Sequence, residues 1–177
     1  DYNKLKLLST CSSLNAMKHT IWFTDIHDIT KVWHLNYRFR AVSGTICLEN
    51  APNVTHLHIT SIGIKVPKYV THVTYNGSYN DGFDSSMSSN DNIKYVMLNR
   101  MRLKEFIASP NLRTLVISSN YPTQYVFGNI RKLIITSNYN LPITLPQTIR
   151  KVKFGFYFNQ PITLPNGTEI AIFGDHF

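Results

Sequence analysis

The stretch that decides the fold lies near the C-terminal end, where residues 139–146 read YNLPITLP and residues 158–165 read FNQPITLP. The two segments differ only at their first and third positions, and they are offset by 19 residues. Their paired prolines favour extended backbone and exclude a helix. A unit this short cannot bury a core alone, so neighbouring units must stack and share one.

A second pattern, with apolar residues at positions one, four and six, recurs along the chain. Successive copies start 16, 23, 19, 18 and 19 residues apart, and a weaker copy, Phe39/Val42/Gly44, precedes them. Because a strand–helix–strand unit needs roughly 30 residues, this spacing predicts parallel strands in one sheet. We expect no helix longer than about three turns after residue 40. The six copies are Val54/Leu57/Ile59, Val70/Val73/Tyr75, Ile93/Val96/Leu98, Leu112/Leu115/Ile117, Ile130/Leu133/Ile135 and Ile149/Val152/Phe154.

The proline-rich segments are predicted to be the return segments that close each coil. Their alignment predicts two buried columns, Ile143 over Ile162 and Leu145 over Leu164. Asn140 and Asn159 also align, and each is expected to bond backbone groups of the neighbouring turn.

The first 36 residues differ from the repeats. Leu5, Leu8, Cys11 and the residues from Leu14 to Met17 recur at steps of three and four, which predicts one or two short amphipathic helices. We therefore divide the chain into a helical cap, residues 1–36, and a solenoid, residues 37–177. Cys11 and Cys47 are expected to be free thiols.

The string FGFYFNQPITLP at residues 154–165, followed by FGDHF at 173–177, resembles the FNIP repeat, a short relative of the leucine-rich repeat found in amoebae and giant DNA viruses. The resemblance covers roughly residues 39–177. It implies a mainly β, leucine-rich-repeat-like solenoid with about 18–19 residues per coil, preceded by short helices.

Residues 1–23 also resemble the second half of an F-box, with Leu5, Leu8 and Trp22 at its leucine-rich helices and following tryptophan. The first F-box helix is absent. The combination implies a substrate receptor of an SCF-type ubiquitin ligase in the host cytoplasm or nucleus. Its partners would be a protein substrate and the linker subunit of the cullin ligase.

Positive charge is concentrated between residues 93 and 153, which hold ten Lys and Arg against one acidic residue, whereas the whole chain has a net charge of +8. Seven of the ten fall at the second, third and fifth strand positions, which we assign to the outer strand face. The predicted partner-binding residues are Lys94, Tyr95, Met97, Arg113, Val116, Arg131, Lys132, Ile134, Arg150, Lys151 and Lys153.

Three interpretations of this face stay open. Its mixture of cations and apolar side chains favours a protein epitope, the cations alone would suit a nucleic-acid or structural scaffold, and a solvated face without function is the simplest alternative. Tyr95 is its one clear aromatic residue, which gives little support to base stacking. The loop from Asn76 to Asn92 is a mobile connection or a second binding site.

Enzymatic chemistry finds no support in the sequence, which has no nucleophile–base set, phosphate loop or paired carboxylates. His56, His58 and His72 fall together on the outer face and are weak metal candidates, with solvated histidines as the alternative. We expect no cofactor. No run of about 18 apolar residues occurs, so no membrane association is expected.

The last coil offers two registers. The repeat alignment places Thr168, Ala171 and Phe173 inward and leaves Ile170 and Ile172 outward, whereas the local apolar pattern would bury the two isoleucines. We follow the repeat register. An outward isoleucine pair on an edge strand would invite self-association through that edge, unless the natural chain continues.

Overall fold

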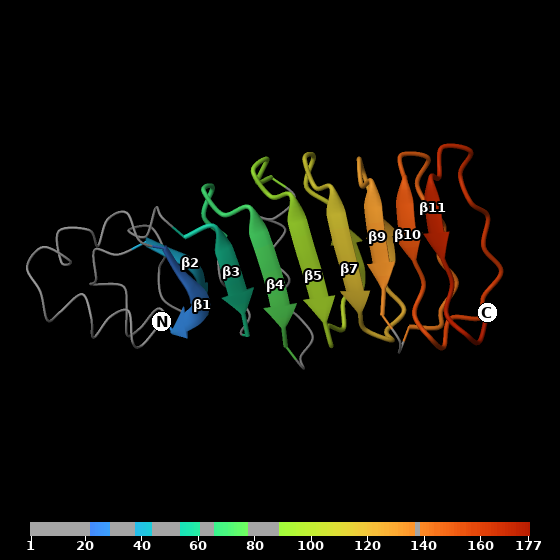
Figure 1. The fold of residues 1–177 in the computed structure, drawn as a ribbon, viewed down its shortest axis with the longest axis horizontal. Helices are drawn as coiled ribbons and strands as arrows, with labels where there is room; N and C mark the ends of the chain where they lie inside the picture. Colours follow the sequence, from blue (N-terminus) through green and yellow to red (C-terminus); the bar gives the residue numbers. More distant parts are fainter. Residues whose placement is uncertain (1–21, 29–37, 44–53, 61–65, 78–88, 137–138) are drawn as a thin grey trace, which may run out of the picture.

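The computed structural model describes residues 22–28, 38–43, 54–60, 66–77, 89–136 and 139–177, the first two ranges mainly by their backbone. Eleven strands and no helix occur in these ranges (Figure 1). The expected N-terminal helices, with Leu5 and Leu8, lie outside the described residues. The strands are β1 (Trp22–Asp28), β2 (Arg38–Ser43), β3 (His56–Ile59), β4 (His72–Asn76), β5 (Tyr95–Asn99), β6 (Glu105–Ile107), β7 (Thr114–Ser118), β8 (Gln124–Val126), β9 (Lys132–Ile135), β10 (Lys151–Lys153) and β11 (Ile170–Ile172).

Nine strands form one parallel sheet in the order β1-β2-β3-β4-β5-β7-β9-β10-β11. Each coil adds one strand beside the previous one, so the chain is a β-solenoid, as the spacing predicts. The six expected strands pair in the expected register, with Leu57 beside Val73 and Leu115 beside Leu133. The weak copy is also confirmed, because Val42 of β2 pairs with Leu57.

The sheet begins earlier than the repeats do. Strand β1 pairs in parallel with β2, and the register shifts between Phe23 and Ile26. Residues 22–28 therefore continue the sheet within the segment that we expected to form a helical cap.

The last coil follows the repeat register. Val152 pairs with Ala171, and Ile170 and Ile172 are 43% and 48% exposed. The local apolar pattern would have buried both isoleucines, so alignment with the preceding coil identifies the inward face correctly.

A four-residue turn leads into most of these strands. In the turn before β7, for example, the Leu112 amide donates to the Ser109 carbonyl over 3.0 Å. The third turn residue then reaches back one coil: the Asn111 side chain donates to the Asp91 carbonyl over 2.9 Å. Such side chains satisfy carbonyls that have no ladder partner and tie each coil to the one before.

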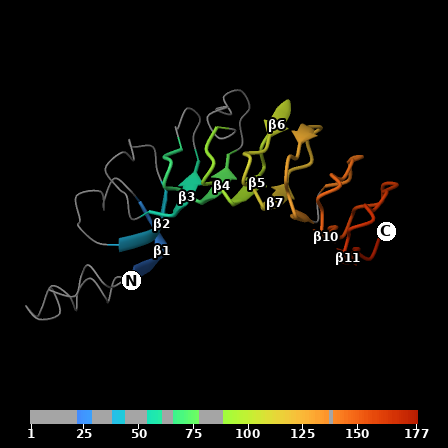
Figure 2. The ribbon, with the colours of Figure 1, turned by 90° about the horizontal axis from the view of Figure 1, so that it is seen from above.

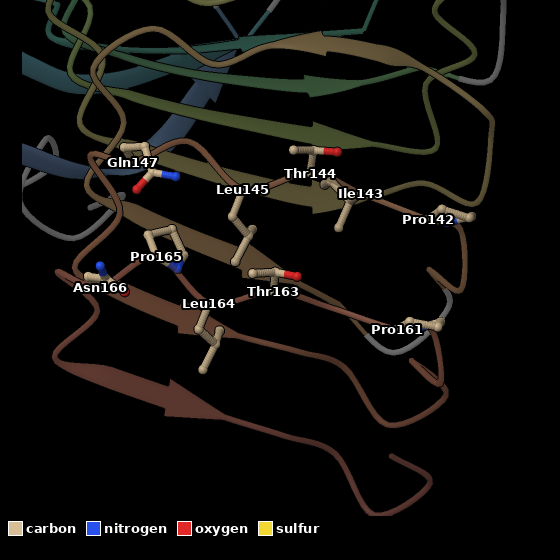
Figure 3. A pocket seen from close by; sticks show the side chains of 10 residues that line it. All are labelled: Pro142, Ile143, Thr144, Leu145, Gln147, Pro161, Thr163, Leu164, Pro165 and Asn166. Carbon is tan, nitrogen blue, oxygen red and sulfur yellow. The ribbon is translucent and has the colours of Figure 1, made fainter.

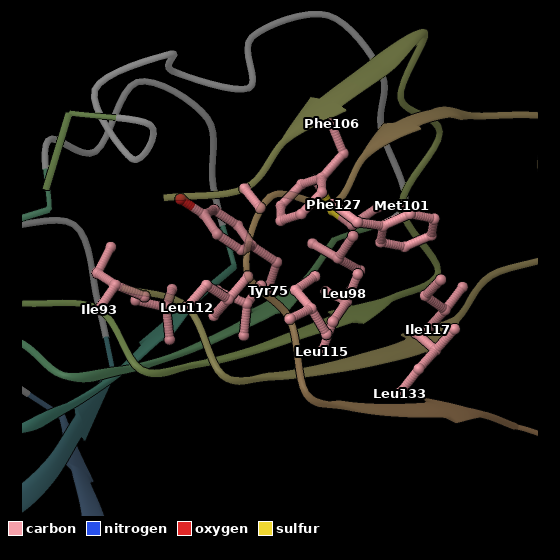
Figure 4. Packing of buried hydrophobic residues seen from close by; sticks show 14 of the residues in the cluster. Tyr75, Ile93, Leu98, Met101, Phe106, Leu112, Leu115, Ile117, Phe127 and Leu133 are labelled. Atoms are coloured by element: carbon pink, nitrogen blue, oxygen red, sulfur yellow. The ribbon is translucent and has the colours of Figure 1, made fainter. Parts of the chain in front are cut away.

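The core lies between the sheet and the return segments (Figure 4). The predicted inward residues of all six copies are buried, and they form continuous columns with side chains from the returns. Leu115, Leu133 and Val152 are at most 2% exposed and are direct neighbours across the ladder.

The returns of the middle coils contain a second, two-stranded parallel sheet that the sequence did not reveal. Strand β6 pairs with β8, which places Phe106 beside Tyr125. Phe106 is fully buried, whereas its neighbours Glu105 and Ile107 are exposed. The central aromatic side chain therefore fixes this three-residue strand against the core.

Asparagines form a hydrogen-bonded ladder where the chain leaves the sheet. The Asn120 side-chain oxygen accepts from the Asn140 amide over 3.3 Å, and the Asn140 side-chain oxygen accepts from the Asn159 amide over 2.8 Å. This confirms the role expected for Asn140. Beside the ladder, Phe158 stacks on Phe154 with ring centroids 4.5 Å apart, so aromatic rings fill the corners of the last coils.

The returns of the last two complete coils lie further apart than the strands. No hydrogen bond joins the described backbone of 142–145 to that of 161–164, and the side chains between them line an open groove (Figure 3). Leu145 is buried as predicted, and Ile143 and Ile162 are partly buried against the core. The prediction for Leu164 is wrong: it is 37% exposed because a coil packs on only one of its sides.

This difference in spacing contributes to the curvature of the solenoid at its last coils. Hydrogen bonding holds adjacent strands about 4.8 Å apart, while the returns at 142–145 and 161–164 spread. The returns of the middle coils do not spread in this way, because β6 and β8 are hydrogen-bonded to each other. Seen from above, the sheet follows the inner side of an arc and the returns follow its outer side (Figure 2). The side of the sheet that points away from the core is therefore concave, and we call it the concave face.

We expect Leu133→Ala to lower the free energy of unfolding by about 2 to 5 kcal/mol, because it opens a cavity in a filled column. Urea titration measures the loss. The control is Lys132→Ala, an exposed neighbour on the same strand, which should cost less than about 0.5 kcal/mol. A loss below about 1 kcal/mol for Leu133→Ala would contradict the column.

Candidate functional site

The concave face is built from outward side chains that the ladder holds in register. The third strand position runs through His56, His72, Tyr95, Thr114, Lys132 and Lys151, and the fifth through His58, Thr74, Met97, Val116, Ile134 and Lys153. The second position, just before each strand, carries Lys94, Arg113, Arg131 and Arg150, whose amides bond the carbonyl one coil earlier. The structure thus brings all the predicted partner-binding residues into three adjacent columns of the ladder.

Cations dominate this face in coils 93–153. Lys94, Arg131, Lys132, Arg150, Lys151 and Lys153 are exposed, and Arg113 is half-buried. Between residues 93 and 153 none of the three columns contains an acidic residue; the next member of the second column, Glu169, lies one coil further on. In these coils the described columns of the face therefore carry an excess of positive charge, which attracts anionic groups.

Two of the guanidinium groups are held in place by the turn of the following coil. The Arg150 Nη1 donates to the Gly167 carbonyl over 2.7 Å, and the Arg113 Nη1 donates to the Asn129 carbonyl over 3.4 Å. A Cβ atom at Gly167 would collide with the Arg150 Nη1, so glycine leaves room for this contact. Sequence reasoning missed Asn129 and Gly167, although both occupy the third turn position.

Apolar side chains run beside the cations. Met97, Val116 and Ile134 are consecutive members of the fifth column. Met97 and Ile134 are half-buried, but Val116 is only 6% exposed, because both flank it. Met97, Val116 and Ile134 thus form an apolar stripe. Val116 offers little contact area in it, whereas Met97 and Ile134 present apolar surface.

Histidines line the N-terminal part of the face. The His56 and His72 rings are nearly parallel with centroids 4.0 Å apart, and Tyr95 continues the stack at 5.4 Å from His72. Each imidazole Nδ1 lies 2.8 Å from the hydroxyl of the preceding threonine. Burial raises the pKa of Tyr95, so its phenol stays neutral.

This stack does not form a chelating site. In parallel rings the in-plane nitrogen lone pairs point in parallel and do not converge on one ion. His58 lies two positions further along its strand. Among the residues that the structure describes, no group of three His, Cys, Asp or Glu side chains could hold a metal ion.

The remaining predicted features fall largely outside the described residues. Trp22 begins β1, but its side chain is not described, and of the Asn76–Asn92 loop only the two ends are. At its far end, the buried Asn90 side chain donates to the Pro67 carbonyl over 3.0 Å. That end is therefore fixed to the preceding turn.

The chain matches no family model, and the searches of curated proteins and of solved structures give no similar protein. In the described part of the chain, no helix is long and apolar enough to cross a membrane. The function is therefore argued from the concave face itself.

His58 gives the structure a specific dependence on pH. Burial lowers the pKa of His58, so the folded chain holds it neutral while the unfolded chain takes up a proton near pH 6.5. Its contribution to stability is complete above about pH 6.5 and is lost as the pH falls towards the lowered folded value.

We expect His58→Thr to reduce the drop in melting temperature between about pH 8 and pH 5.5. Threonine suits this position because Thr74 occupies it in the next coil. Thermal unfolding followed by circular dichroism measures the effect, with Thr74→Val as a control that changes the same column without a titratable group. An unchanged drop in His58→Thr would show that protonation of His58 is not linked to unfolding.

Proposed function

We propose that this chain is a protein–protein interaction module that captures its partner on the concave face. The observation that carries the proposal is that seven cations and an apolar stripe lie in register on one curved face. Protein interfaces combine an apolar centre with charged surroundings, and a concave surface buries more of a partner than a flat one. Repeat solenoids commonly bind through such extended concave surfaces.

The resemblance to F-box and FNIP-repeat proteins supports a more specific role as substrate receptor of an SCF-type ubiquitin ligase. In this role the solenoid selects the substrate, the segment containing Leu5, Leu8 and Trp22 docks to the linker subunit, and other subunits catalyse ubiquitin transfer. The site of action would be the host cytoplasm or nucleus. Binding of purified linker subunit to the full chain, measured by calorimetry, tests the ligase role separately from substrate capture.

A nucleic-acid-binding scaffold is the second candidate, favoured by the same seven cations. It accounts less well for the apolar stripe, since phosphate contacts gain nothing from Met97 or Ile134. Within the described columns beside the cations, Tyr95 is the only aromatic side chain available for base stacking.

Reversing three charges together, Arg113→Glu, Arg131→Glu and Arg150→Glu, should abolish partner capture and lower the melting temperature by no more than about a few degrees. Arg131 and Arg150 are exposed and Arg113 is half-buried, so the loss of their charges and of the two turn hydrogen bonds costs little stability. Their combined field, in contrast, steers association. Affinity purification from host lysate, read by mass spectrometry, compares the variant with the wild type.

The matched control reverses Arg100, Arg102 and Lys104, which lie after β5 on the way to the returns and carry the same total charge. Capture should survive in this control. Equal capture by both variants would place the binding site elsewhere, and capture lost after nuclease treatment would favour the nucleic-acid candidate.

A further inference from the structure

The concave face is divided into two parallel bands that run across the strands. The basic band comprises Lys94, Arg113, Arg131 and Arg150 at the second position with Lys132 and Lys151 at the third. The apolar band comprises Met97, Val116 and Ile134 at the fifth position, and Lys153 follows Ile134 at this position in the next coil. Both bands follow the solenoid axis and cross the strand direction.

The spacing of the bands sets the size of a matching ligand. The second and fifth positions of a strand are about 10 Å apart, which is close to the diameter of an α-helix. From the coil of Lys94 to that of Arg150 the basic band spans three steps of about 4.8 Å. That length corresponds to roughly ten residues of helix, or about three turns.

We propose that the partner presents an acidic amphipathic helix, which lies along the solenoid axis with carboxylates on the basic band and apolar side chains on the apolar band. This inference rests on the proposed function and adds the chemistry of the partner. Charge complementarity selects carboxylates, because the described columns contain no acidic residue between 93 and 153 and the nearest one in them, Glu169, adjoins Arg150 alone. The half-buried Met97 and Ile134 select an apolar side of the helix that faces the middle of the strands.

The anchored guanidinium groups suit this ligand. Arg150 and Arg113 each donate one hydrogen bond to a turn carbonyl, which limits the freedom of their side chains before binding. A partially ordered arginine loses less entropy on pairing with a carboxylate than a freely rotating one does. Arginine also has further donors for a carboxylate after one is used.

The test uses a fluorescent peptide of about 16 residues with glutamates on one helical side and leucines on the other, titrated with the full chain and read by anisotropy. A peptide of the same composition in scrambled order keeps the charge and loses the amphipathic pattern. A single-stranded oligonucleotide of similar charge represents the nucleic-acid alternative. We expect the patterned peptide to bind at least about tenfold more tightly than either.

One variant of each band tests the two bands separately. Reversal of Arg113, Arg131 and Arg150 should weaken the patterned peptide by at least about tenfold, while reversal of Arg100, Arg102 and Lys104 should leave it unchanged. The double substitution Met97→Thr and Ile134→Thr should weaken it by at least about fivefold, since threonine keeps the strand and removes apolar contact. If the double variant fails to fold, Met97→Thr alone serves, with a smaller loss expected in the same direction.

Equal affinity for the patterned and scrambled peptides, or for wild type and the apolar-band variant, would overturn the proposal. Tighter binding of the oligonucleotide would do the same. If the patterned peptide fails to bind while lysate capture still depends on the three arginines, the amphipathic helix is wrong and the interaction module stands. If the patterned peptide does not bind and lysate capture does not depend on the three arginines, both the amphipathic helix and the interaction module are wrong.

Discussion

Backbone hydrogen bonding between successive coils is the constraint on which the other features of this protein depend. The amide of Lys94 bonds the carbonyl of Thr71, that of Arg113 bonds Lys94, and that of Arg131 bonds Arg113. These bonds fix the register of each strand on the one before it. A slip of one residue would exchange the buried and outward side chains, so one set of bonds determines both the core columns and the composition of the concave face.

The same bonds explain the shape. The strands are held at ladder spacing, whereas the Pro142–Pro146 and Pro161–Pro165 returns lack such bonds and spread apart. Proline at these positions removes amide donors and keeps the segments extended. This spreading contributes to the curvature at the last coils, and the sheet lies on the inner side of the arc (Figure 2).

Sequence reasoning succeeded where the structure repeats and failed where single residues depend on their surroundings. The columns could be predicted because the apolar spacing survives the variation in coil length, and Ile170 and Ile172 were placed by alignment. Strands β6 and β8 were missed because three residues with one inward aromatic leave too short a pattern. The burial of Val116 and the exposure of Leu164 depend on neighbours in adjacent coils. Alternation along a single strand cannot show these neighbours.

The parallel register is tested most directly by engineered disulfides in a chain whose Cys11 and Cys47 are replaced by serine. Thr114 and Lys132 are direct partners across β7 and β9, so cysteines at both positions should have Cα atoms about 4.8 Å apart and oxidise readily. Cysteines at Thr114 and Ile134 are offset by two residues, about 8 Å apart, and should remain reduced. Mass spectrometry after mild oxidation distinguishes the two. The account predicts a disulfide in the first pair alone; preferential oxidation of the second pair, or equal oxidation of both, would contradict the register and with it the concave face.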